Sequence, residues 1–224
     1  MSSLFSYVLR YDDGAAPNPF WGTCTLAICK PAIRRKAQIG DWVAGTGSKN
    51  SPVKDISGRL VYAMKVTGKM TLQQYDEFCK NSLPGKIPKW FTGKFKERMG
   101  DCIYDYLNGE VPTLRPSVHK ELNRNRDLSG KFVLLSEEFY YFGNKPIPLP
   151  EELAPIVKTN QGHKRIESEF LIRSFELWIN KFPMNQLKGQ PQLKKEFTTK
   201  RDIRSRCSRN HFDADNSSRE EVLC

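Results

Sequence analysis

Short β-type segments set the main constraint on how this chain can fold. Each one mixes apolar, aromatic and β-branched residues, and the segments are separated by turns rich in Gly, Pro and Asn, which is typical of short strands. The predicted strands cover residues 4–11, 23–29, 41–46, 59–66, 131–136 and 139–142. No apolar run approaches the roughly 18 to 20 residues that a membrane span requires. We therefore expect a soluble protein built on a small sheet.

Two helices are predicted in addition to the strands. Thr71 is a suitable N-cap, and Gln74 three residues later completes a capping box, so a short helix begins there. A longer helix is predicted from residue 164 to residue 182. Its apolar stripe comprises Ile166, Phe170, Leu171, Phe175, Trp178, Ile179 and Phe182. Residues 81–130 carry little periodicity, which suggests long loops or a poorly ordered insertion.

The length and composition fit one domain with an appendage. The chain has 224 residues and a mass of 25.8 kDa, and 38% of its residues are hydrophobic, which is enough for one core. We predict an α+β domain over residues 1–182, built on a small mixed or barrel-like sheet, followed by a basic tail over residues 183–224. The start of the sequence has neither a basic leader nor an apolar segment of secretory length, so a cytoplasmic location is expected.

The six cysteines are scattered, with no CxxC pair and no histidine at zinc-ligand spacing. Cys24 and Cys29 alone are close enough in sequence to suggest a metal site, but the remaining ligands are missing. Most of the cysteines are expected to be buried thiols. The sequence therefore predicts no disulfide framework, no metal and no cofactor.

Charge gives the first indication of a partner. Lys and Arg total 36 against 25 Asp and Glu, a net charge of +11, and such an excess favours polyanions through counterion release. From Lys188 to Arg209 there are eight basic and two acidic residues, a net charge of +6. This segment is predicted to be a basic arm that contacts nucleic acid or docks a protein partner. The alternative is a tail that is merely solvated.

The stretch from Tyr11 to Gly47 is the most polar and most punctuated part of the predicted domain. Asn18 lies between two prolines that stiffen an extended loop, so its amide is held on a rigid scaffold. A rigid amide offers a donor and an acceptor together, as the edge of a nucleobase requires, and Phe20 and Trp21 supply faces for stacking. The alternative is that Asn18 satisfies turn backbone and the aromatic rings belong to the core.

A basic cluster follows that loop, with four cations in seven residues and no acid: Lys30, Arg34, Arg35 and Lys36. Such a cluster is suited to neutralise phosphates beside a base pocket. The run from Gly45 to Ser48, which includes Thr46, is predicted to be a glycine-rich turn that either cradles an anion or closes a hairpin. It lacks the Gly-Lys-Thr ending of a phosphate-binding loop.

The candidate catalytic groups are few. Of the three histidines, His163 either caps the helix predicted from residue 164 or contacts a base, a phosphate or a leaving group, whereas His119 falls in a polar loop. Asp13 is a candidate carboxylate or a turn capper. Tyr140 and Tyr141 are predicted to point to opposite faces of a strand, so that one ring packs in the core and the other is free to stack.

Taken together, these residues define a predicted nucleotide site and a first catalytic set to test, Asp13 with Asn18 and His163. The site residues predicted to contact a nucleotide are Asp13, Asn18, Phe20, Trp21, Trp42, Thr46, Tyr140, Tyr141 and His163. Lys30, Arg34, Arg35 and Lys36 are the predicted phosphate contacts.

The sequence resembles the nucleotide modification associated domain 2 family over about residues 4 to 180. In the first part the resemblance is carried by Asp13-Gly14, Ala16 to Pro19, Thr25-Leu26-Ala27, Cys29, Pro31, Ile33, Arg34 and Gly40-Asp41-Trp42. Later it is carried by Leu60 to Val66, a helix with Tyr75, Gly100-Asp101, Ile103-Tyr104, Leu135-Ser136, Phe139 to Gly143, Ile147-Pro148 and Gly162-His163. The family is named for genes near DNA base-modification systems of phages and bacteria, so the resemblance implies that context.

A looser pattern, a strand followed by Gly-Asp-Trp, a Val-rich strand and a short helix, is similar to PUA-like ASCH and EVE domains, which are small β-barrels that bind RNA or modified bases. The leading hypothesis is therefore a module that binds a nucleobase or modified nucleotide, most simply in DNA, within a modification or defence pathway. One alternative is an enzyme that edits, transfers to or hydrolyses a modified nucleotide. A further alternative is a protein-interaction inhibitor or assembly component.

Overall fold

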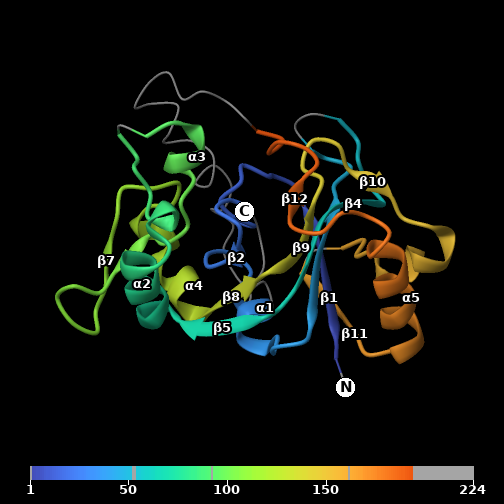
Figure 1. Ribbon diagram of the computed structural model, residues 1–224, viewed down its shortest axis with the longest axis horizontal. Coiled ribbons are helices and arrows are strands. Elements are labelled where there is room, and N and C mark those ends of the chain that lie inside the picture. The colour runs from blue at the N-terminus through green and yellow to red at the C-terminus, as the bar shows by residue number, and fades with distance from the viewer. Residues whose placement is uncertain (1, 52–53, 92, 161, 194–224) are drawn as a thin grey trace.

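A computed structural model describes residues 2–51, 54–91, 93–160 and 162–193 (Figure 1). Its largest feature is a mixed sheet, the main sheet, in the order β11-β1-β3-β4-β9-β12, with β10 paired to β4. Its strands are β1 (Leu4–Leu9), β3 (Trp42–Gly47), β4 (Arg59–Lys65), β9 (Glu138–Tyr141), β10 (Ile147–Pro148), β11 (His163–Ile166) and β12 (Gln186–Leu187). The pairs β1–β3 and β9–β12 are parallel and the other pairs are antiparallel. The predicted α+β class and mixed sheet are confirmed.

A second sheet joins β2 (Cys24–Leu26), β8 (Phe132–Ser136) and β5 (Gly68–Thr71) in the order β2-β8-β5. One bent antiparallel ribbon runs through both sheets. On one side of the ribbon β4 continues into β5, and on the other side β8 continues into β9, so that β4 pairs with β9 and β5 pairs with β8. Lys65 pairs with Glu138 in the main sheet, and Gly68 pairs with Leu135 in the second sheet. A small separate ribbon pairs β6 (Tyr104–Asp105) with β7 (Thr113–Leu114).

Short helices surround the two sheets: α1 (Pro31–Lys36), α2 (Leu72–Asn81), η1 (Pro84–Lys86), α3 (Phe95–Arg98), η2 (Glu121–Asn123), α4 (Arg124–Ser129), η3 (Glu151–Ile156) and α5 (Glu169–Ile179). The predicted capping box of α2 is confirmed. Thr71 Oγ1 accepts a hydrogen bond from the Gln74 amide at 3.2 Å, and Gln74 Oε1 accepts one from the Thr71 amide at 2.9 Å.

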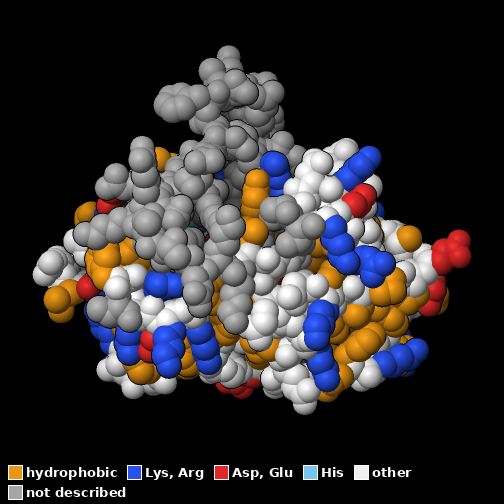
Figure 2. All heavy atoms as spheres, turned by 90° about the horizontal axis from the view of Figure 1, so that it is seen from above, with side chains coloured by type: hydrophobic (Ala, Val, Ile, Leu, Met, Phe, Trp, Pro, Cys, Tyr) orange, Lys and Arg blue, Asp and Glu red, His pale blue; other side chains and the backbone are white. Residues whose placement is uncertain are grey.

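The prediction of a helix from residue 164 is wrong in its first part. His163–Ile166 form β11 against β1, so His163 does not cap a helix, and α5 begins after Ser168, whose hydroxyl accepts from the Leu171 amide. The edge of β1 offers backbone partners that a polar tetrapeptide can use, and this tertiary pairing outweighs local propensity. Phe170 is 80% exposed and does not join the core stripe. Seen from above, hydrophobic side chains gather on the surface at the side that carries α5 (Figure 2).

Two further sequence expectations are wrong. Residues 81–130 are not a loose insertion, because they contain regular elements and fully buried side chains such as Met99 and Ile103. The run from Gly45 to Gly47 is not a turn, since it lies inside β3. There the missing side chain of Gly45 makes room for an aromatic ring, because a Cβ atom would approach Tyr62 Cε1 to 2.4 Å.

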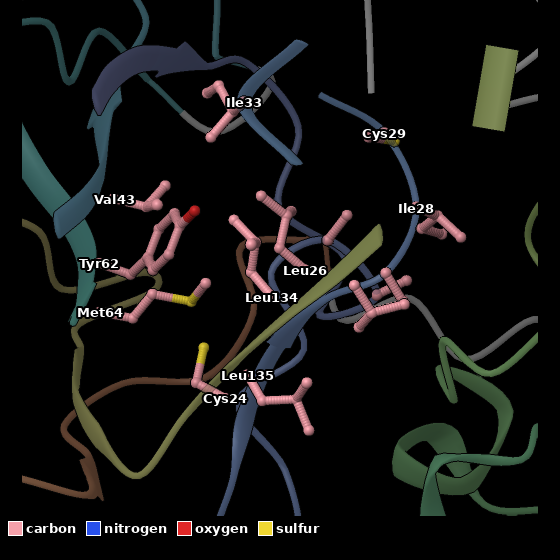
Figure 3. Close-up of a cluster of buried hydrophobic side chains, with 14 of the residues drawn as sticks. Cys24, Leu26, Ile28, Cys29, Ile33, Val43, Tyr62, Met64, Leu134 and Leu135 are labelled. Carbon is pink, nitrogen blue, oxygen red and sulfur yellow. The ribbon is translucent and has the colours of Figure 1, made fainter. Parts of the chain in front are cut away.

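Two apolar clusters lie on opposite faces of the main sheet. The first fills the space between the two sheets, where Val43 and Tyr62 face Leu26 and Leu134 (Figure 3). The second lies under α5 and η3, and includes Trp42, Tyr140, Phe175 and Ile179. Tyr141 belongs to the first cluster and Tyr140 to the second, which confirms the predicted opposite orientations. The expectation that one of the two rings is free to stack is wrong, because both are buried.

The chain continues to pack on the domain beyond residue 182. Strand β12 pairs with β9, and the Leu193 amide donates to the Asp12 carbonyl at 2.9 Å. Most of the predicted basic arm, from residue 194 onward, lies outside the described residues. Within the part that is described, no helix combines the length and the apolar character needed to cross a bilayer.

Candidate active site

A thiol, an imidazole and a carboxylate meet between α1 and α4. Cys29 Sγ lies 3.6 Å from His119 Nε2, and His119 Nδ1 lies 2.5 Å from Asp127 Oδ2. Cys29 comes from the turn between β2 and α1, His119 from the loop before η2, and Asp127 from α4. Cys29 and His119 are 2% and 4% exposed. The three side chains therefore form one buried chain of polar contacts.

Asp127 organises both of the other groups. Its Oδ1 accepts the Cys29 amide at 3.1 Å, and its Oδ2 also accepts the Tyr104 hydroxyl at 3.0 Å. Burial alone would raise the pKa of the Asp127 carboxyl, but the charge and hydrogen bond of His119, with help from Arg34, hold it below its ordinary value. An ionised Asp127 makes His119 Nδ1 the donor, which leaves Nε2 directed at the Cys29 thiol.

The backbone at Cys29 is strained. Cys29 has φ 59° and Lys30 has φ 41°, two consecutive non-glycine residues in the left-handed region, and each such residue costs about 1–3 kcal/mol. Arg34 helps to hold this turn, since its Nε donates to the Cys29 carbonyl at 2.8 Å and its Nη1 to the Ala27 carbonyl at 2.7 Å. Backbone strain of this kind persists only where the surrounding structure holds the residue in place, and strained residues cluster at functional sites.

The same guanidinium connects the turn to α4. Arg34 Nη2 donates to the Asp127 carbonyl, and the side chain is fully buried. A Cβ atom on Gly130 would lie 2.2 Å from Arg34 Cζ, so this glycine provides the space that the guanidinium occupies. Arg34 thus fixes the turn at Cys29 and helix α4 relative to each other.

A second polar group extends from Lys30 toward Asp12. Lys30 Nζ lies 4.5 Å from the centre of the Tyr7 ring, and the hydroxyls of Tyr7 and Tyr62 are 2.9 Å apart. The Tyr141 hydroxyl donates to Asp12 Oδ2 at 2.7 Å. Burial raises the pKa of Asp12 to about 7.

Tyr7 lies between the Cys29 contacts and the Asp12 contacts, and its pKa responds to both. Burial raises it, and negative charge at Cys29 or Asp12 would raise it further, which places the Tyr7 hydroxyl in the electrostatic field of both residues.

The predicted reader of a base edge, Asn18, is fully buried and internally bonded. Its Nδ2 donates to the Met99 carbonyl at 2.7 Å, and its Oδ1 accepts from the Phe20 amide and from Lys86 Nζ. Lys86 also contacts Thr25 Oγ1 at 2.9 Å. The Pro-Asn-Pro loop therefore holds residues 18–25 against residues 86–101.

The other predicted nucleotide contacts do not gather at one place. Trp42 and Tyr140 lie on the α5 face of the main sheet, where they bond to Glu176 and Asn180. Thr46 donates to the Tyr7 carbonyl, and Tyr141 lies on the face opposite to Trp42. Phe20 is buried against a half-buried Trp21, with ring centres 5.6 Å apart.

Asp13 and His163, the predicted catalytic pair, each contact residues other than Asn18. Asp13 Oδ1 accepts the Ala15 amide at 3.0 Å within the loop after β1. His163 lies on β11, and its ring centre is 5.9 Å from that of Phe5. Neither contact joins them to Asn18.

The predicted phosphate contacts separate in a similar way. Arg34 is fully buried among backbone carbonyls, and Arg35 Nη1 donates to the Ser129 carbonyl at 2.8 Å. Lys36 is exposed at the end of α1. Lys30 follows Cys29 in the chain, and its Nζ lies over the Tyr7 ring.

Sequence reasoning missed the Cys29, His119 and Asp127 set. Cys29 belongs to the residues that carry the family resemblance, but no local motif pairs it with a histidine 90 residues later or a carboxylate 98 residues later. Among the residues that the structure describes, no three His, Cys, Asp or Glu side chains are arranged to hold a metal ion.

Comparison with known proteins gives one family. Nucleotide modification associated domain 2 matches residues 1–201, which is most of the chain. No curated protein matches the sequence, and no solved structure matches it.

Proposed function

Because the chain belongs to the nucleotide modification associated domain 2 family, we propose that it is an enzyme that acts on a nucleotide or nucleobase through Cys29. The observation that carries the proposal is the contact of Cys29 Sγ with His119 Nε2, with His119 oriented by Asp127. A nucleophile, a base and an orienting carboxylate in this order are the arrangement that activates a thiol for covalent catalysis.

The proposed reaction is attack on a carbonyl or amidine carbon carried by the nucleotide. His119 Nε2 takes the thiol proton while Cys29 Sγ forms a bond to that carbon, and the imidazolium then protonates the departing nitrogen or oxygen. Water or another acceptor, deprotonated by His119, breaks the carbon–sulfur bond and restores the thiol. In each half of the reaction His119 takes a proton from the attacking group and gives one to the departing group. This cycle suits a transfer or a hydrolysis.

This proposal is the enzyme alternative raised by the sequence. The hypothesis of a module that only reads a base relied most on Asn18, whose amide is fully buried and bonded to protein groups. A nucleic-acid partner, which the net charge of +11 favours, remains part of the proposal. The role of the basic arm and the cytoplasmic location also remain proposals.

Alkylation by iodoacetamide tests the proposed nucleophile. With intact protein at pH 7, peptide mass spectrometry should show Cys29 modified at least about ten-fold faster than Cys24, because burial raises the pKa of the Cys24 thiol to about 12. His119→Gln should slow the Cys29 reaction and shift its pH dependence upward. The matched control, Leu122→Ala at an exposed position three residues after His119, should leave both unchanged. Equal rates for Cys29 and Cys24 in a folded protein would contradict the proposal.

A further inference from the structure

A basic and aromatic surface lies away from the Cys29 site, at the segment that leads into α3. We call it the α3 surface, and it consists of Trp21, Lys89, Phe91, Lys94 and Lys96. Phe91 is 69% exposed, and the three lysines are exposed as well. Figure 1 shows α3 at the upper edge of the molecule, on the opposite side from α5. An exposed aromatic ring and exposed cations therefore lie within one short segment of the chain.

Trp21 is presented to this surface at a cost in backbone strain. It has φ 62°, which for a bulky side chain is a true outlier. Its indole lies directly over Gly85, where a Cβ atom would approach Trp21 Nε1 to 2.4 Å. Lys96 Nζ lies 4.9 Å from the centre of this ring, so the cation is held against an aromatic face.

Buried contacts make the base of the surface rigid. Lys86 Nζ donates to Asn18 Oδ1 at 2.8 Å and to the Thr23 carbonyl at 2.7 Å, which ties the Trp21 loop to the α3 segment. Within residues 86–98 the acidic side chain is Glu97, whose Oε2 accepts the Lys94 amide at 2.8 Å and whose Oε1 lies 3.6 Å from Lys89 Nζ, so one of the three lysines is partly neutralised. The surface therefore has a positive excess on a fixed frame.

We propose that the α3 surface binds a single-stranded polynucleotide, with phosphates on Lys89, Lys94 and Lys96 and an unpaired base stacked on Phe91. Cations that follow a backbone, combined with an aromatic ring that accepts the face of any base, are the two elements of single-strand binding. A duplex hides base faces inside its stack, so an exposed ring favours an unpaired strand over a duplex. That the bound strand is also the substrate of Cys29 rests on the proposed function; the binding itself does not.

Fluorescence anisotropy with a fluorescein-labelled 15-nucleotide oligothymidylate tests this surface in the full chain. Phe91→Ala should weaken binding about ten-fold or more at fixed salt. Lys94→Gln with Lys96→Gln should lower the slope of log affinity against log salt by about 1.4. The matched control, Lys145→Gln with Lys181→Gln, removes the same charge from exposed sites elsewhere and should leave affinity within about two-fold of wild type.

The outcomes separate this proposal from the previous one. Wild-type affinity and slope in both α3-surface variants would overturn it and assign binding to another part of the chain. Equal loss for oligothymidylate and for poly-glutamate in Lys94→Gln with Lys96→Gln, without an effect of Phe91→Ala, would also overturn it in favour of a general anion site. Phe91→Ala should leave the iodoacetamide rate of Cys29 as in wild type, so failure of either test leaves the other proposal standing.

Discussion

Helix α5 packs apolar side chains against one face of the main sheet. On the opposite side of the sheet, several ionisable side chains are buried. Under α5 the cluster is built from residues such as Leu153, Phe175 and Ile179. Across the sheet, Arg34, Lys86, Asp101 and Asp127 are all buried and hydrogen-bonded. We call these the α5 side and the polar side.

The α5 side and the polar side differ in how much stability a substitution costs. Apolar packing depends on volume, so small losses have graded costs. A buried charge depends on the presence of each partner, because an unpaired polar group in a low-dielectric interior has a large desolvation cost. The candidate catalytic residues lie on the polar side, where the same contacts that stabilise the fold also orient the thiol and the imidazole.

The largest expected effect is on the polar side. Arg34→Met should reduce the free energy of unfolding by about 3–5 kcal/mol, since it leaves the carbonyls of Ala27, Cys29 and Asp127 without their buried donor. Lys36→Met, two residues later on the exposed face of α1, is the control and should change stability by less than about 0.5 kcal/mol. Urea denaturation measures both. Similar small losses would show that burial of the guanidinium is not a stability determinant.

Asp12 should make the stability depend on pH. Its pKa of about 7 in the folded state lies above the ordinary value of 3.8, so the folded protein holds this proton more tightly. The unfolding free energy from this group therefore falls as pH rises from 4 to 7, by up to about 4 kcal/mol. Urea denaturation of wild type and Asp12→Asn from pH 4 to 8 should show a difference that changes in this direction. A constant difference would contradict it.

Asn18→Ala should cost about 2–3 kcal/mol of stability, because it leaves the Met99 carbonyl and the Phe20 amide unsatisfied and removes one partner of Lys86. Thermal unfolding compares it with Asn125→Ala, an exposed asparagine on α4 that should be nearly neutral. A neutral result for Asn18→Ala, together with weaker oligothymidylate binding, would instead restore the sequence-based interpretation of Asn18 as a ligand contact.

The smallest expected effect tests the α5 side. Ile179→Val removes one buried methyl group and should cost about 0.5–1.5 kcal/mol, as graded packing predicts. Leu177→Val, on the exposed face of the same helix, should cost less. Equal urea midpoints for Ile179→Val and wild type would mean that this cluster is packed more loosely than the burial of Phe175 and Ile179 implies.

The comparison also explains what the sequence could predict. Most predicted strands and the capping box at Thr71 are local patterns, and the structure confirms them. Strand β11 was missed because a polar His-Lys-Arg-Ile segment becomes a strand only through its partner β1. The sequence predicts residues 81–130 to be loose because periodicity detects apolar faces. In the structure this region is held by scattered buried apolar side chains such as Met99 and by hydrogen-bonded buried groups such as Lys86 and Asp101.

The site was harder to predict than the fold. A basic run gives no sign that Arg34 points inward while Lys36 points outward. The Pro-Asn-Pro loop correctly indicates a constrained Asn18, but its partners Met99 and Lys86 are 81 and 68 residues away. The same distance in sequence hides the contact of Cys29 with His119, so chemistry could be assigned only after the chain was folded.

That separation in sequence has a consequence for the newly made chain. Asp127 follows Cys29 by 98 residues, and at about 5–20 residues per second a ribosome needs roughly 5–20 s to add them. During this interval the Cys29 thiol has neither His119 nor Asp127 to contact. The activation that we propose for this thiol therefore requires the completed fold, and a copy truncated before Asp127 would lack it.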